Sequence, residues 1–324
     1  ADSYAEVAPD VAHALHMPSH IFVALGMWQE VVASNIASWE ASVQRMEDKD
    51  LKGGARSYHA LNWLQYGLLQ QGKDESARRL LQDMVAYTAE DPTKSARAYL
   101  VDMKGGYLVE TAEWDSPEAE IEVDLEDLNV VHVAVYHFLD GMRAYLQNDA
   151  AALQAKLDLV QEAREEAALM VTEEGLPMCA PAAASGYAPN QQDLDKARVI
   201  ELELLALLAD LQGDGTQTEE YLKEAVALEK EATFSYGPPP IVYPSFELYA
   251  EWLLQQGRAA DALAQLETAL QRGPKRSRAL RAQIEAAGQL GREEIAEAAL
   301  ADPDEIARLA TIDYPPQEEK SMPQ

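Results

Sequence analysis

The strongest constraint on the fold is a repeated pentapeptide. Leu-Leu-Gln-Gln-Gly occurs at residues 68–72 and again at 253–257, and an alanine follows five residues after the glycine in both places. Such similarity between distant segments indicates one structural unit that is used more than once. Apolar residues recur around both copies at three- and four-residue spacing, which is typical of amphipathic helices. Because glycine readily adopts the positive φ that ends a helix, the sequence predicts helical hairpins that turn at a glycine.

Aligning the rest of the chain on this turn predicts six hairpins. The last two turns are separated by 34 residues, and the longer intervals between the others hold insertions. The predicted turn residues are Gly26, Gly72, Asn148, Gly213, Gly257 and Gly291.

The insertions differ in composition. Residues 99–109 predict one more helix, and the acidic stretch 110–127 follows it. Within that stretch Ile121, Val123 and Leu125 alternate with acidic residues, which favours an extended segment or a loop lying on the helices. Proline and glycine in residues 175–190 predict a loop, and the Tyr-Gly-Pro-Pro-Pro run at 236–240 predicts a rigid connector.

The clearest unit spans residues 244–274. Its helix, glycine turn, second helix and final proline are marked by Phe246, Tyr249, Ala250, Leu253, Gly257, Ala262, Leu266, Ala269 and Pro274. This spacing resembles the tetratricopeptide repeat, a 34-residue helix-turn-helix. The resemblance implies an all-α fold, a tetratricopeptide-like α-solenoid in which antiparallel helix pairs form a right-handed superhelix, here with a long acidic insertion. In such a solenoid the first helices line a concave groove.

A second resemblance rests on the segment His-Met-Pro-Ser-His-Ile-Phe at 16–22, on Gly-Met-Trp at 26–28 and on residues 237–249. These segments are similar to a family of larger, poorly characterised bacterial tetratricopeptide proteins, many of them predicted to be exported. The resemblance therefore favours a periplasmic or exported protein over a cytoplasmic one. Pro9 falls where an earlier repeat would end, so we expect a longer protein whose missing N-terminal portion contacts this chain.

These observations divide the chain into five segments. Residues 1–109 are predicted to hold N-terminal hairpins with a truncated first repeat, and 110–130 the acidic insertion. Middle hairpins with the loop at 175–190 occupy 131–235, C-terminal hairpins occupy 236–314, and 315–324 form a polar tail.

Charge and cysteine content exclude several classes of function. The chain carries 56 acidic and 26 basic residues, a net charge of −30, so it would be repelled by nucleic acid and by anionic membranes. It has no apolar run long enough to insert into a membrane. Its single cysteine, Cys179, excludes an intramolecular disulfide and cysteine-based zinc sites. No nucleophile elbow, phosphate loop or dinucleotide fingerprint is present, so we do not expect an enzyme.

Histidines form the most specific cluster. His13, His16 and His20 fall on one stripe of a helix, where their imidazoles could converge on one metal ion. By the tetratricopeptide resemblance they face the groove, and His59 of the next hairpin lies beside them. Pro18 would kink this helix and either open or spoil the stripe. The plainer interpretation is that these imidazoles bond to neighbouring helices or pack against the missing repeat. His132 and His137 are five residues apart and cannot share a ligand on one helix.

The leading functional hypothesis is a non-catalytic scaffold that binds a peptide or protein segment in the groove and requires no cofactor. The alternative is a metal-binding or metal-handling protein that takes zinc, copper or nickel at His13, His16, His20 and His59. A third class, a hydrolase with a histidine-bound metal, would need an open coordination position and a base. Groove contacts implied by the resemblance are Asn62, Tyr66, Glu203, Glu247, Glu251, Arg278 and Arg281.

Overall fold

The computed structural model describes residues 11–172, 174–176, 188–232 and 236–299, and in these ranges the protein is all-helical. Pro9, Cys179, most of the predicted loop at 175–190 and the predicted tail at 315–324 lie outside the described residues. The helices are α2 (Ala12–His16), α3 (Ser19–Ala24), α4 (Trp28–Asp48), α5 (Tyr58–Gln70), α6 (Asp74–Glu90), α7 (Lys94–Thr111), α8 (Val130–Leu146), α9 (Ala150–Ala168), α11 (Gln191–Leu211), α12 (Gly215–Glu231), α13 (Ser245–Gln255), α14 (Ala259–Arg272), α15 (Ser277–Leu290) and α16 (Glu293–Ala299). Two short 3₁₀ helices, η1 (Gly53–Ala55) and η2 (Pro117–Glu120), lie in connections.

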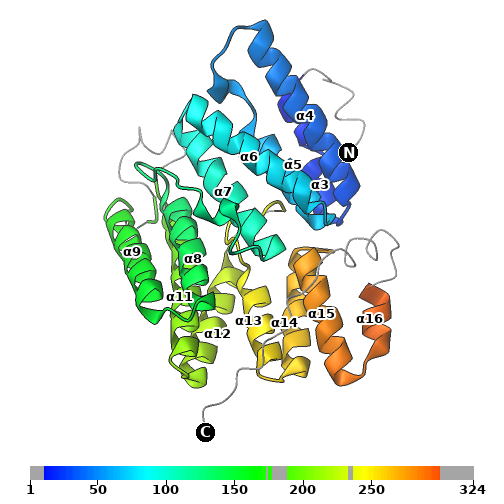
Figure 1. Cartoon of the computed structure of the whole chain (residues 1–324), viewed down its shortest axis with the longest axis vertical. Coiled ribbons are helices and arrows are strands. Elements are labelled where there is room, and N and C mark those ends of the chain that lie inside the picture. Colours follow the sequence, from blue (N-terminus) through cyan, green and yellow to red (C-terminus); the bar gives the residue numbers. More distant parts are fainter. Residues whose placement is uncertain (1–10, 173, 177–187, 233–235, 300–324) are drawn as a thin grey trace.

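Neighbouring helices pack in pairs, as Figure 1 shows. The turns join α3 to α4, α5 to α6, α8 to α9, α11 to α12, α13 to α14 and α15 to α16. Each of the six predicted turn residues, Asn148 included, has a φ between 56° and 75°. The predicted turns and the additional helix, α7, are therefore confirmed. The fold is all-α with paired helices, and the tetratricopeptide solenoid stays a prediction.

In the first five hairpins the second helix buries the same two positions, five and nine residues after the turn. In the hairpins that share the pentapeptide these positions hold Ala77 with Leu81 and Ala262 with Leu266, all of them fully buried. An alanine at the first position lets the paired helices approach closely, and a leucine at the second fills the space one turn on. The first hairpin also buries the position nine residues after its turn, but that position holds the polar Asn35 instead of a leucine.

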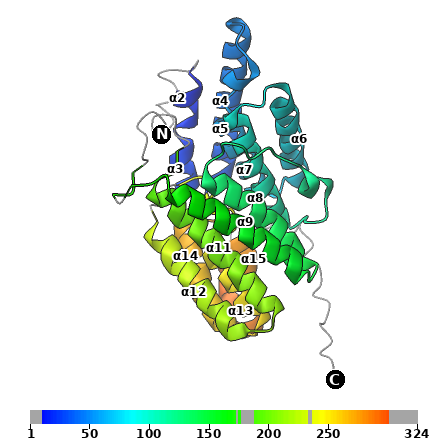
Figure 2. The same cartoon turned by 90° about the vertical axis from the view of Figure 1, so that its left-hand side faces the viewer.

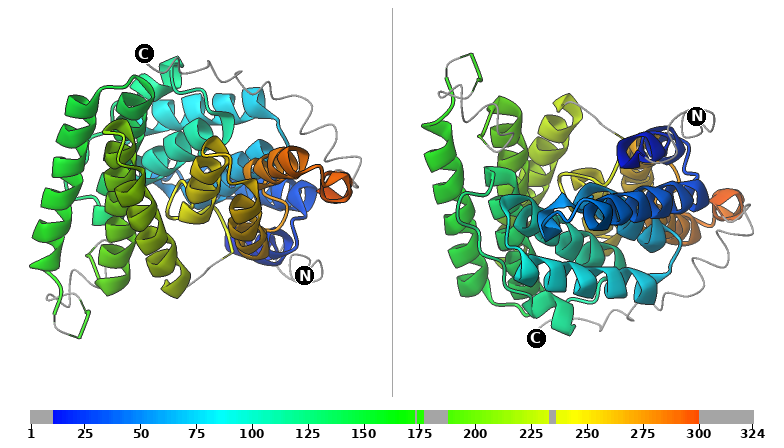
Figure 3. Two further views of the ribbon diagram at one scale, coloured as in Figure 1. Left: turned by 90° about the horizontal axis from the view of Figure 1, so that it is seen from below. Right: turned by 90° about the horizontal axis from the view of Figure 1, so that it is seen from above.

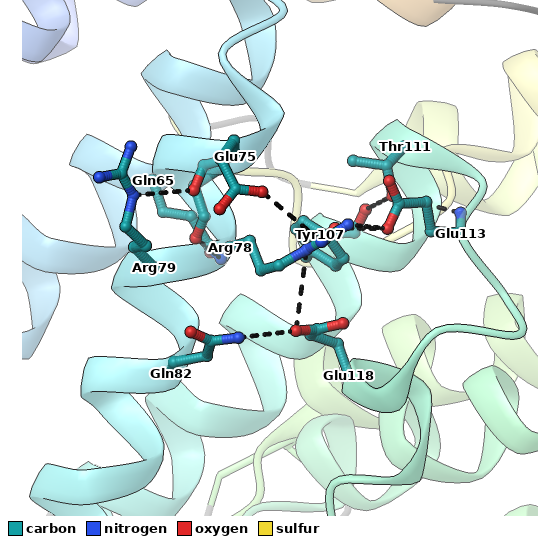
Figure 4. A network of polar contacts seen from close by, with 10 residues as sticks. Gln65, Glu75, Arg78, Arg79, Gln82, Tyr107, Thr111, Glu113 and Glu118 are labelled. Carbon is teal, nitrogen blue, oxygen red and sulfur yellow. Dashed lines mark hydrogen bonds and ion pairs between the residues drawn. The ribbon is translucent and has the colours of Figure 1, made fainter.

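The acidic stretch lies along the helices as an extended segment. Ile121, Val123 and Leu125 pack against the core, whereas the acidic residues between them are exposed. Basic side chains of the helices hold the segment in place. Arg78 of α6 bonds with Glu113, contacts Glu118 at 3.8 Å and donates to the Tyr107 hydroxyl at 2.8 Å (Figure 4). The alternation in the sequence is thus confirmed as one buried and one solvated side.

The first and last hairpins lie side by side. The indole N–H of Trp28, at the start of α4, donates to the carbonyl of Lys275 at 3.0 Å. Gln70, at the end of α5, accepts from the backbone N–H of Ser277 at 2.8 Å. Figures 2 and 3 show α14 and α15, which belong to successive hairpins, lying against the N-terminal helices. These contacts therefore join the N-terminal hairpins to the C-terminal ones. No helix among the described residues is long and apolar enough to cross a membrane.

Candidate metal centre

Three of the predicted histidines meet at one point. His16 is on α2, His20 on α3 and His59 on α5. The Nε2 atom of His16 lies 3.3 Å from Nε2 of His20 and 3.0 Å from Nε2 of His59. One donor atom from each of the three residues lies within 4.8 Å of the other two. Two nitrogens bound to one tetrahedral zinc ion stand roughly 3.3 Å apart, so these separations suit a shared cation.

Pro18 breaks the predicted helix without separating His16 from His20. α2 ends at His16 and α3 begins at Ser19, so the two imidazoles face each other across the break. His13 is exposed and lies outside the group, contrary to the expected stripe of three. His13 lies on α2 with His16, but the side of α2 that packs against α4 is that of His16, which is buried against Asn35.

Second-layer contacts orient the rings. The Oδ1 atom of Asn35 lies 2.8 Å from Nδ1 of His16. The Nδ2 atom of Asn35 donates to Ser19 Oγ at 2.9 Å and to the Val31 carbonyl at 2.8 Å. Exchanging the oxygen and nitrogen of this amide would break the bond to the Val31 carbonyl, so the orientation of Asn35 is fixed. Nδ1 of His16 is therefore assigned the proton, which leaves a bare lone pair on Nε2. His59 has a similar partner, since its Nδ1 lies 3.0 Å from the Tyr99 hydroxyl.

Loss of water around the ring lowers the pKa of two of the three imidazoles. Burial lowers the pKa of His16 to about 4, the hydrogen bond that His16 donates to Asn35 opposes that decrease, and the charges of His59 and His20 add to it. The side chain of His59 is exposed, yet loss of part of the water around the ring still lowers its pKa, as do the charges of His20 and His13. Trp63 packs its ring edge-on against His16 and His20 at 4.7 and 4.6 Å between centroids. Neutral, oriented imidazoles are the form that binds transition metals.

The cluster opens to two clefts. His59 and His16 line one of them together with His13. The other, of about 470 Å³, is lined by His20, His59, Asp102, His132 and residues 236–240. In the described part of the chain no carboxylate or thiol joins the three histidines as a close fourth member. A metal at this point would therefore keep a coordination position open to solvent.

An aspartate and a histidine form a pair in the second cleft. Oδ1 of Asp102, on α7, is 3.7 Å from Nε2 of His132, on α8. Burial lowers the pKa of His132, but the carboxylates of Asp102 and Asp193 raise it further than burial lowers it. His137 does not join this pair, and burial lowers its pKa.

Most predicted groove residues are bonded inside the protein. Glu247 and the Tyr66 hydroxyl accept from the buried guanidinium of Arg276. Glu203 accepts from the hydroxyl of Ser245 at 2.7 Å. Arg278 donates to Glu251 at 2.8 Å. Of the two remaining residues, Asn62 lines the 470 Å³ cleft and Arg281 lines another cleft of about 700 Å³.

Residues that orient the cluster were missed at the sequence level, and one of them had a signal. Asn35 stands nine residues after Gly26, where two other hairpins bury Leu81 and Leu266. An amide at a core position asks for a buried polar partner, which here is His16. Tyr99 and Asp102 carried no such signal, because their approach to His59 depends on how α5 and α7 pack.

Comparison with known proteins adds no further constraint. No family model matches the chain, and no similar sequence is found among curated proteins.

Proposed function

We propose that this protein binds a transition-metal ion through His16, His20 and His59. The observation that carries the proposal is the convergence of three imidazole nitrogens from three helices at separations of 3.0 and 3.3 Å. Asn35 supports it by assigning the bare nitrogen of His16 to the shared point. Three imidazoles and an open position suit zinc, copper or nickel.

Metal analysis of the purified, tag-free protein tests this proposal. We expect about one equivalent of zinc after incubation and dialysis, and none in a His16→Ala/His20→Ala variant. His13→Ala is the matched control, since His13 is on the same helix but outside the group. Because His16 is buried, the double variant is checked by circular dichroism, and the more exposed His59→Gln provides a second test. Zinc content that is equal in wild type and His59→Gln would refute the site.

A peptide-binding scaffold is a second candidate, favoured by the 700 Å³ cleft. Three predicted groove residues, Glu251, Arg278 and Arg281, line it beside Trp114 and Trp252. Aromatic walls with charged groups of both signs suit a short peptide segment. A displayed peptide library should yield binders that Arg281→Glu no longer retains. If every selected peptide binds Arg281→Glu as well as wild type, the cleft is not the binding surface.

A further inference from the structure

The proposed metal site has a carboxylate beside it that is placed for proton transfer. Tyr99 of α7 contacts His59 at 3.0 Å, and Asp102 follows it by three residues, which puts both side chains on one face of the helix. The negative charge of Asp102 acts on His59 and opposes the decrease of its pKa. His20, His59 and Asp102 also line the same cleft.

Asp102 is near the three histidines without belonging to their group. Their donor atoms lie within 4.8 Å of one another, and no Asp102 oxygen meets that limit among the described residues. His132 restrains the carboxylate through Oδ1 at 3.7 Å, and the side chain of Asp102 keeps 33% of its exposure. A carboxylate one step outside the ligand set can reach a water molecule bound to the metal rather than the metal itself.

We propose that the site hydrolyses an uncharged carboxylic ester, with Asp102 as the catalytic base. This inference rests on the metal site proposed above and assigns it a reaction. A metal-dependent hydrolase requires an open position on the metal and a base in the same cleft. The three-histidine group would leave the position open, and Asp102 would be the base.

The lining of the cleft selects the substrate class. Trp63, Val131, Val135 and Val242 give it apolar walls, and prolines 238–240 lie along it. A volume of about 470 Å³ suits a small organic molecule. Lys196 also lines the cleft, but it is paired with Asp193 at 3.4 Å. Asp102 and the net charge of −30 therefore disfavour a phosphate ester, which brings negative charge of its own. An ester with a short apolar acyl chain is compatible with both the charge and the walls.

The reaction balances without a further reactant. A metal held by His16, His20 and His59 would supply the positive charge that makes a water molecule acidic. Asp102 would take one proton from the attacking water, and the oxygen of that water would form a bond to the carbonyl carbon. The bond from that carbon to the alkoxy oxygen then breaks. The proton passes from Asp102 to the departing alkoxide, so the products are an alcohol and a carboxylic acid. His132 acts as a positioning residue in this scheme, because it contacts Asp102 and not the reacting atoms.

The test compares wild type with Asp102→Asn, which keeps the shape of the side chain. Both proteins, each with all 324 residues, are loaded with zinc, and their zinc content and affinity are measured. Hydrolysis of p-nitrophenyl butyrate is then followed by absorbance. We expect equal zinc binding and a loss of about 100-fold in kcat/KM for Asp102→Asn, the scale of general base catalysis. Asp83→Asn, an exposed carboxylate on α6, should keep wild-type activity. Bis(p-nitrophenyl) phosphate should be cleaved more slowly than the ester.

Each contrary result overturns a different step. A protein that binds zinc but cleaves the ester no faster than the zinc-free form refutes the hydrolase and leaves the metal site standing. Full activity in Asp102→Asn would show that Asp102 is not the catalytic base. A tenfold or greater loss of zinc affinity in that variant makes Asp102 a ligand instead, and faster cleavage of the phosphate diester overturns the substrate class. A protein that takes up no zinc fails at the proposed function itself.

Discussion

Replacing Arg276 with methionine tests whether the buried polar network is structural. The guanidinium donates to Glu247 at 2.6 and 3.0 Å, lies 2.8 Å from Glu110, and donates to the Tyr66 hydroxyl. These partners come from α5, α7 and α13, so one side chain connects the N-terminal hairpins to the C-terminal ones. Methionine fills similar volume and makes none of these bonds.

The loss is large because both carboxylates stay buried. Glu110 keeps 3% and Glu247 keeps 1% of its exposure. Removing one partner from such a buried ion pair costs about 3–5 kcal/mol. Burial already raises the pKa of Glu247, with Arg276 opposing that increase. In the variant the folded-state pKa of Glu247 is raised further, so its stabilisation by a bound proton is lost as pH rises. The deficit should therefore be larger at pH 8 than at pH 5.

Urea unfolding followed by tryptophan fluorescence measures this deficit. We expect Arg276→Met to lower the free energy of unfolding by about 3–5 kcal/mol at pH 8. A triple variant that adds Glu110→Gln and Glu247→Gln should recover most of the loss, since it leaves neither carboxylate of this network buried without a partner. A deficit below about 1 kcal/mol, or one that does not change between pH 5 and pH 8, would refute the reasoning.

Three further predictions concern the turns, the metal site and a buried carboxyl group. Gly257→Ala should lower the free energy of unfolding by about 1–2 kcal/mol, because φ is +69° and no atom crowds the position, whereas Gly288→Ala inside α15 should raise it by about 0.8 kcal/mol; equal urea midpoints would contradict this. Asn35→Ala should weaken zinc binding about 10- to 100-fold in a competition titration, because the His16 ring would lose the hydrogen bond that orients it. Unchanged zinc affinity would show that Asn35 does not orient a metal ligand. Burial raises the pKa of Glu203, so stability from its bound proton is lost as pH rises, and the melting temperature of Glu203→Gln should gain on wild type from pH 5 to pH 9. A difference that stays constant over that range would argue against a buried titrating carboxyl group.

The helices and turns were predictable because their causes are local. A positive φ at a hairpin turn depends on the residue that occupies it, so Gly72 and Gly257 could be identified from their neighbours alone. Asn148 could also be identified, since asparagine is among the few residues that adopt this conformation. The alternation around Val123 predicted an extended segment or a loop lying on the helices, and the apolar residues of this segment do pack against the core.

The histidine site was predictable only in part. The spacing of His16 and His20 is local, and the resemblance to tetratricopeptide repeats brought His59 beside them. The exposure of His13 depended on which side of the short helix α2 packs against α4, and the spacing of the histidines does not encode that. The approach of Asp102 depended on the packing of α7 against α5, which no local pattern in the sequence encodes.

Facing side chains on neighbouring helices can bind a ligand or one another, and their chemical complementarity decides between these outcomes. Arg276 meets acceptors on Glu247, Glu110 and Tyr66, so this part of the predicted groove is satisfied within the protein. The three imidazoles differ, because Nε2 of His16 faces two other Nε2 atoms. A proton on one of these nitrogens can be donated to a single neighbour, whereas a metal ion accepts a lone pair from all three. Facing helices therefore bond internally where donors meet acceptors, and we expect a bound cation where three imidazole nitrogens converge.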